Sequence, residues 1–189
     1  MTKKQIALKR ASELKDRIQD YLDVKERIPS GMAAAEQAKM EEKKRKILTH
    51  LKGTEENWKD YRWQLKNRIS DLDTLRRFIS LDPAEADAVQ RVAEKYRWSI
   101  SPYYLSLIDD DNTYDPIKLQ AIPMVAELRD TGLTDPMAEE FTNPAGAITR
   151  RYPDRVIINV TNQCAMYCRH CQRRRNIGSD AHHTSREKL

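Results

Sequence analysis

Three cysteines within eight residues constrain this chain more than any other feature of its sequence. Cys164, Cys168 and Cys171 follow the spacing C-x3-C-x2-C, and the 189 residues contain no other cysteine. A secreted disulfide framework tends to use an even number of cysteines spread along the chain. An odd and close group is typical of metal ligands that are kept reduced, which favours a cytoplasmic location.

The spacing of the cysteines favours an open iron–sulfur cluster. Three thiolates on one short loop can bind three corners of a [4Fe–4S] cubane and leave its fourth iron free to bind a further ligand. The alternative is a zinc site of three cysteines and one histidine, with His170, His182 or His183 as the fourth ligand. Zinc knuckles usually begin with C-x2-C, so this alternative is less favoured; a reactive-thiol role is the third interpretation.

Residues 155–161 predict a strand that ends just before the cysteines. The run Arg-Val-Ile-Ile-Asn-Val-Thr is almost continuously β-branched, as in a parallel strand that is buried on both faces. Ligands just beyond the carboxyl end of such a strand are where α/β barrels keep their chemistry. We therefore expect residues 151–189 to form the start of such a barrel.

The preceding residues are expected to be mostly helical and to fall into two regions. Residues 1–70 carry 18 Lys and Arg against 11 Asp and Glu, and their apolar stripes are too thin for a core of their own. We interpret this basic extension as solvated helices, with an acidic partner or nucleic acid as the alternative. Residues 71–150 form a pre-barrel region, where Asp82-Pro-Ala-Glu85 predicts a helix over 83–96 and prolines make 116–153 irregular. No apolar run approaches the ~18 residues of a membrane span.

The residues around the cysteines resemble those of one enzyme family. The motif C-x3-C-x-Φ-C after a barrel strand is the signature of the radical S-adenosylmethionine superfamily. The longer stretches 150–155 (Arg-Arg-Tyr-Pro-Asp-Arg) and 164–178 resemble the lysine 2,3-aminomutase family, as do residues 101–109 and 115–123. The resemblance covers residues 71–187, and Gln172 with Asn176-Ile-Gly178 is closest in look to the glutamate 2,3-aminomutase branch.

This resemblance implies a fold and an activity. The implied fold is a mostly α N-terminal region that leads into the first strand of a partial, truncated (β/α)6 radical S-adenosylmethionine barrel, an α/β architecture. The implied enzyme is an isomerase that moves an amino group from Cα to Cβ of an amino acid, with glutamate favoured as substrate and lysine next. Its cofactors would be a [4Fe–4S] cluster, S-adenosyl-L-methionine and pyridoxal 5′-phosphate. Its partners would be a flavodoxin- or ferredoxin-type electron donor and further copies of the full-length chain, with no membrane and no nucleic acid.

The resemblance also assigns roles to residues at and after the cysteines. Cys164, Cys168 and Cys171 match the cluster ligands, and His170 matches the position beside the adenine of S-adenosylmethionine. Arg173 matches the arginine that binds the substrate carboxylate, a role that suits the fork geometry of a guanidinium group.

Upstream, Arg151, Tyr152 and Arg155 match the residues that hold the phosphate of pyridoxal phosphate. The lysine that binds that cofactor in relatives lies downstream of residue 189. We therefore expect an N-terminal fragment that binds a cluster poorly and is inactive in isolation. The alternative is an inactive truncated product that acts only as a helical interaction module.

Overall fold

The computed structural model describes residues 1–28, 30–129, 132–133 and 135–188. The chain divides into two compact units, Met1–Ala38 and Lys39–Leu189, whereas the sequence predicted a boundary at residue 70. Ile47 and Ile69 precede that residue, yet they are 0% and 2% exposed and belong to the core of the larger unit. Among the described residues, no helix combines the length and the apolar character that a membrane span requires.

The smaller unit is helical and contains no buried residue among those described. Helix α1 (Lys3–Asp16) begins at a capping box that Thr2 forms with Gln5. Helix α2 (Gln19–Val24) and a 3-10 turn, η1 (Lys25–Arg27), follow after an interruption at Arg17 and Ile18. The apolar stripe predicted for this region is present in the sequence, but it covers no core: none of its members is buried, and Ile6 and Leu14 are 55% and 47% exposed.

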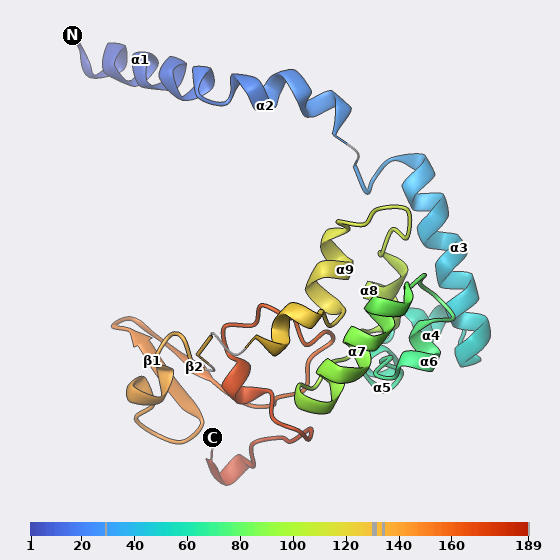
Figure 1. Ribbon diagram of the computed structural model, residues 1–189. Helices are drawn as coiled ribbons and strands as arrows, with labels where there is room; N and C mark the ends of the chain where they lie inside the picture. Colours follow the sequence, from blue (N-terminus) through green and yellow to red (C-terminus); the bar gives the residue numbers. More distant parts are fainter. Residues whose placement is uncertain (29, 130–131, 134, 189) are drawn as a thin grey trace. The chain divides into compact units, whose positions relative to one another are not determined.

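The larger unit contains most of the helices, and most of these are short (Figure 1). They are α3 (Ala34–Leu51, which begins in the smaller unit), α4 (Glu55–Lys59), α5 (Tyr61–Lys66), α6 (Leu72–Leu75), α7 (Pro83–Lys95), α8 (Pro102–Ser106), α9 (Pro116–Ala121) and the 3-10 helices η2 (Val125–Leu128), η3 (Glu139–Thr142), η4 (Arg174–Asn176) and η5 (Arg186–Lys188).

Helix α7 begins where its sequence predicts. Asp82 accepts a hydrogen bond from the Glu85 amide, the Glu85 side chain accepts one from the Asp82 amide, and Pro83 occupies the first turn. Ala86, Val89 and Val92 lie on one face of this helix and are buried, as the pattern over 83–96 indicates. The expected mostly helical region before residue 151 is confirmed.

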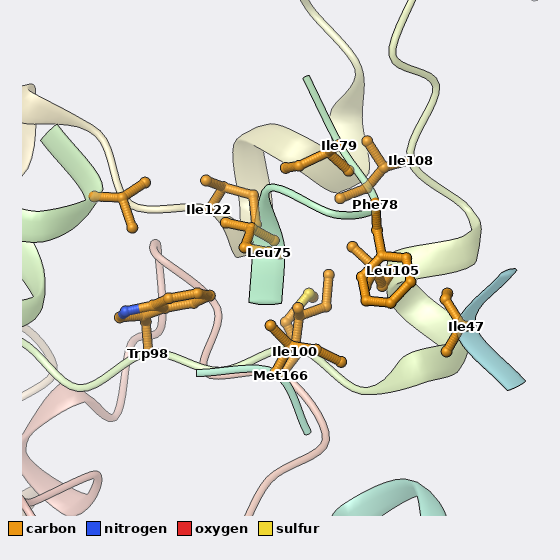
Figure 2. Packing of buried hydrophobic residues seen from close by; sticks show 13 residues of the cluster. Ile47, Leu75, Phe78, Ile79, Trp98, Ile100, Leu105, Ile108, Ile122 and Met166 are labelled. Carbon is orange, nitrogen blue, oxygen red and sulfur yellow. The ribbon is translucent and has the colours of Figure 1, made fainter. Parts of the chain in front are cut away.

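The core includes both the helices and residues 164–171, which carry the cysteines and are called the cysteine segment below. Ile47, Leu75 and Leu105, from three different helices, are fully buried, and Figure 2 shows Met166 beside Ile100 in the same cluster. Ile100 forms antiparallel bridges with both Ile69 and Met166. Because Met166 is only 6% exposed, the cysteine segment is part of the core and not an appendage to it.

The predicted buried parallel strand is corrected by the structure. β2 (Arg155–Ile158) pairs antiparallel with β1 (Ile148–Tyr152), with Ile148 opposite Ile158 and a register shift between Thr149 and Tyr152. Val156 and Ile158 are each 50% exposed, so β2 is not buried on both faces. The β-branched run favours a strand, but the choice of neighbour depends on the turn after Tyr152, which folds the chain back onto β1. In the described residues the sheet has two strands and there is no barrel.

Candidate functional site

The cysteine segment is held in place through its backbone. The Ala165 carbonyl accepts a hydrogen bond from the Ser101 amide at 2.9 Å, and the Tyr167 amide donates to the Ser99 carbonyl at 3.4 Å. Arg68 donates from Nη1 to the Cys164 carbonyl at 2.6 Å. The loop between the first two cysteines is therefore fixed to residues 68–101 on both sides of Met166.

All three cysteines line one cavity of about 1010 Å³. None forms a disulfide, and Cys164 is exposed while Cys168 and Cys171 are half-buried. Burial raises the pKa of the Cys168 thiol, and negative charge on Cys164 and Cys171 would raise it further. The three thiols are thus close enough to interact electrostatically and open to the same space.

The donor set at this cavity consists of three thiols, the ligand type that the irons of a cubane bind. Among the described residues, no group of three or more His, Cys, Asp or Glu side chains is arranged to hold one metal ion. A cubane presents a separate iron to each thiolate, so its ligands need not converge on one point. Three cysteines around a shared cavity are a suitable donor set for such a cluster.

Two histidines line the same cavity and bear on the zinc alternative. His182 and His183 lie beside residues 161–162. Thr161 and His183 form an isolated antiparallel β-bridge, and the His182 amide donates to Asn162 Oδ1 at 2.7 Å. The Asn162 side-chain amide in turn donates to the Ile177 carbonyl at 2.8 Å. The third candidate, His170, is exposed and is not part of the cavity lining.

A buried ion pair connects the cysteine segment to Glu127. The Arg169 guanidinium forms a bidentate pair with Glu127, with Nε 2.9 Å from Oε1, and it also donates to the Arg97 carbonyl at 3.2 Å. The Arg169 side chain is 4% exposed and that of Glu127 is 14% exposed. Arg174 adds a second guanidinium at 3.4 Å from Glu127 Oε2 and donates from Nη1 to the Cys168 carbonyl at 3.5 Å. Burial lowers the pKa of Arg174, and the positive charge of Arg169 lowers it further.

Arg173 and Arg175, which line the cavity, pair with a different acidic segment. Arg173 donates from Nε and Nη2 to the two carboxylate oxygens of Glu139, at 3.2 and 3.1 Å, and Glu139 is 2% exposed. Arg175 Nε lies 3.4 Å from Asp135. Burial alone would raise the pKa of Asp135, but hydrogen bonds from the Glu140 and Glu139 amides and the charge of Arg175 lower it overall. Arg175 Nη2 also lies 3.6 Å from Glu139 Oε2, so Arg173 and Arg175 share Glu139, whereas Arg174 pairs with Glu127.

The residues predicted to hold a cofactor phosphate lie on the β1–β2 hairpin. Tyr152 and Arg155 are paired across the turn, with the guanidinium carbon 5.3 Å from the ring centroid. Arg155 donates hydrogen bonds from Nε and Nη2 to the two carboxylate oxygens of Asp154, and this interaction lowers the pKa of the Asp154 carboxyl. Arg151 donates to the Met137 carbonyl at 3.2 Å. The structure does not bring these residues into the cavity lining that contains the cysteines.

Reasoning from the sequence missed the acidic side of the site. Glu127, Asp135 and Glu139 lie in the irregular stretch before β1, and no spacing links them to the arginines more than 30 positions later. Arg68 was missed for the same reason, because its contact spans 96 positions. No local signal could have identified these partners, since each pair forms only through the tertiary fold.

Comparison with models of known protein families gives no match. Among individual proteins, the chain is 56% identical over 182 residues to the glutamate 2,3-aminomutase of Clostridioides difficile, which covers 96% of this chain and 43% of that protein. It is 44% identical over 137 residues to an L-lysine 2,3-aminomutase of Acetoanaerobium sticklandii, covering 71% of this chain and 33% of the relative. It is 43% identical to that of Bacillus subtilis over 126 residues, which is 66% of this chain and 27% of the relative.

The match to the glutamate enzyme extends into residues 1–70, because only seven residues of the chain lie outside its 182. The resemblance drawn from the cysteine region is confirmed: the chain is a homologue of proteins named glutamate 2,3-aminomutase and L-lysine 2,3-aminomutase, and it spans less than half of their length.

Proposed function

We propose that this chain contributes the cluster-binding segment of a radical S-adenosylmethionine and pyridoxal phosphate-dependent 2,3-aminomutase, with glutamate as the favoured substrate and lysine next. The observation that carries the proposal is the 56% identity over 96% of the chain to a glutamate 2,3-aminomutase, against 44% over 71% for an L-lysine 2,3-aminomutase. When bound, the cluster with S-adenosylmethionine would supply one-electron chemistry at the substrate Cβ, and pyridoxal phosphate would hold the amino group.

The proposed role of Cys164, Cys168 and Cys171 is to bind three irons. Their shared cavity and their freedom from disulfides support this role. The backbone contacts of Ala165 and Tyr167 fix the segment independently of any metal, so the thiols are presented from a preformed loop. Ligands that must stay reduced are consistent with a cytoplasmic location, and an electron donor of the flavodoxin or ferredoxin type is part of the proposal.

The contact of Arg173 with Glu139 supports its proposed role as the substrate carboxylate site. A guanidinium group has two edges that can accept a bidentate carboxylate. Glu139 occupies the edge formed by Nε and Nη2, so the edge formed by Nη1 and Nη2 remains for a second carboxylate. Because Arg173 lines the cavity and its side chain is 40% exposed, a substrate can approach it from the cysteine side.

The other proposed contacts lie outside the cavity lining. We propose that His170 approaches the adenine of S-adenosylmethionine, which agrees with its exposed position. Arg151, Tyr152 and Arg155 are proposed to bind the phosphate of pyridoxal phosphate. Since the Arg155 guanidinium is hydrogen-bonded to the Asp154 carboxylate, a phosphate dianion would have to replace that carboxylate.

The cluster proposal is tested by anaerobic reconstitution of the chain with iron and sulfide. We expect the isolated chain to bind the cluster weakly, but the iron that it takes up should depend on the cysteines, so Cys168→Ala should lose this iron while the matched control Ser179→Ala retains it. Iron analysis, absorbance and electron paramagnetic resonance provide the measurements. A colourless protein that binds zinc through His182 or His183 would overturn the cluster and support the zinc alternative.

The aminomutase proposal is tested in a chimera in which this chain replaces the matching 43% of the C. difficile glutamate 2,3-aminomutase. We expect β-amino acid formation from glutamate in preference to lysine. Arg173→Lys should raise KM for the amino acid by at least about tenfold, because a lysine cannot form the bidentate pair, whereas Arg150→Lys should not. A chimera that carries iron yet converts neither substrate would refute the proposal.

A further inference from the structure

A second cavity lies on another side of the cysteine segment. Its volume is about 590 Å³, and it shares only Tyr167 and Gly178 with the lining of the cysteine cavity. Residues from α5, from the end of α7 and from the segment at 97–99 that follows α7 form most of its wall. Nothing in the proposed function uses this space, which falls within the size range of ligand sites.

The lining of this cavity is strongly basic. Lys66, Arg68, Lys95 and Arg97 supply four cationic side chains, and Glu94 is the one acidic side chain that accompanies them. Lys95 lies against the Tyr96 ring, with Nζ 5.2 Å from its centroid. Such an excess of one charge in a concave site attracts anions.

Several hydrogen-bond donors remain at this surface after the contacts that the structure records. Arg68 makes both of its recorded hydrogen bonds, to the Cys164 carbonyl and the Tyr167 hydroxyl, through Nη1, which leaves Nε and Nη2. Arg97 makes one contact, from Nη1 to the Ile177 carbonyl at 3.5 Å. Both guanidinium groups lie against the Tyr167 ring, at 5.5 and 4.5 Å from its centroid, which restrains their planes.

Ser99 provides an independent observation. The residue is only 4% exposed and lines the cavity, and its Oγ has no hydrogen-bond partner within the described part of the chain. A buried hydroxyl without a hydrogen-bond partner costs free energy, so binding of a group that supplies one is favoured at this position. At this position, a ligand with acceptor oxygens would satisfy it.

We propose that this cavity is a binding site for a phosphate group, either as inorganic phosphate or as the phosphate of a nucleotide. The available groups are all donors: two guanidinium edges, the ammonium of Lys66 and the hydroxyl of Ser99. A phosphate dianion offers more acceptor oxygens and more charge than a carboxylate, so it matches this set better. The inference is independent of the proposed function, because it uses neither the thiols nor Arg173.

The test measures phosphate binding to the 189-residue chain, with no iron, S-adenosylmethionine or amino acid present. Isothermal titration with inorganic phosphate and with adenosine monophosphate, at constant ionic strength set by chloride, gives Kd for both sources of phosphate. Tighter binding of the nucleotide would identify a nucleotide site, and equal binding would identify a site for the phosphate alone. The absence of phosphate binding above the chloride background would overturn the proposal and leave the aminomutase proposal untouched.

Three variants locate the binding. Ser99→Ala should weaken phosphate binding about tenfold, since one hydrogen bond to a charged group is lost, and it should leave the melting temperature in chloride unchanged or slightly higher. Lys66→Gln, an exposed position with no ion pair among the described residues, should weaken binding about threefold. Lys59→Gln makes the same charge change outside the cavity and should have no effect. Equal affinities in all three variants would refute the site.

Discussion

Replacing Glu127 with glutamine should destabilise the protein more than any surface charge change. Glu127 pairs with Arg169, whose side chain is 4% exposed, and it also pairs with Arg174. Removing one partner of a buried ion pair leaves a charge without compensation and costs about 3–5 kcal/mol. Glutamine retains one acceptor oxygen for Arg169, so we expect a value near the lower end, about 3 kcal/mol.

Urea unfolding followed by circular dichroism measures this loss. With a slope of about 2 kcal/mol per molar urea, a loss of about 3 kcal/mol lowers the unfolding midpoint by roughly 1.5 M. The control is Asp87→Asn, which breaks an ion pair with Arg91 whose side chains are 61% and 54% exposed. An exposed helix pair of this kind contributes about 0.3–0.5 kcal/mol, so the midpoint should move by about 0.2 M. Equal shifts in the two variants would refute the argument that burial gives the Glu127 pair its importance.

Three further predictions concern the core, a helix start and the response to acid. Leu105→Ala should lower the free energy of unfolding by about 2–5 kcal/mol in the same urea assay, because Leu105 is fully buried in the core. Asp82→Ala removes the capping box of α7 and should cost about 0.5–2 kcal/mol, with a measurable loss of helix content before global unfolding. The pKa of Asp135 is lower in the folded protein than its ordinary value of 3.8, so its stabilising effect is complete above that pH and is lost as the pH falls through the folded-state pKa. Asp135→Asn should therefore be less stable than the wild type near neutral pH, and the difference should shrink below about pH 4 in urea unfolding at each pH.

Elements set by local signals could be predicted from the sequence. The start of α7 depends on contacts within four residues, between Asp82 and Glu85, and the prediction is confirmed. The β-branched run over residues 155–161 also predicts a strand, and residues 155–158 form β2, but the run does not predict the partner of that strand. The structure pairs β2 with β1 across the turn after Tyr152 and leaves Ile158 half exposed, whereas a continuous β-branched run indicates neither the partner strand nor what covers its faces.

The same distinction applies to the site. The cysteines and Arg173 are recognised by spacing, and the homologues support the family to which that spacing points. The assignment of those residues to metal and substrate stays a prediction. The carboxylates that orient the arginines could not be found, because an arginine run does not indicate which acid each member will contact. Only the fold brings Glu139 to Arg173 and Glu127 to Arg169.

These contacts explain why the helical region matters for the chemistry proposed at the cysteines. Met166 is bridged to Ile100, the Cys164 carbonyl accepts a hydrogen bond from Arg68, and Arg169 is anchored by Glu127. Each anchor comes from a segment between residues 68 and 127, and together they restrain the loop on both sides of its first two cysteines. A cluster site needs ligands whose positions do not depend on the metal alone, because flexible thiols would lose conformational entropy on binding. The segments between residues 68 and 127 therefore act as the scaffold of the site, and weakening the Glu127 anchor should reduce iron retention by the reconstituted chain even though Glu127 contacts no thiol.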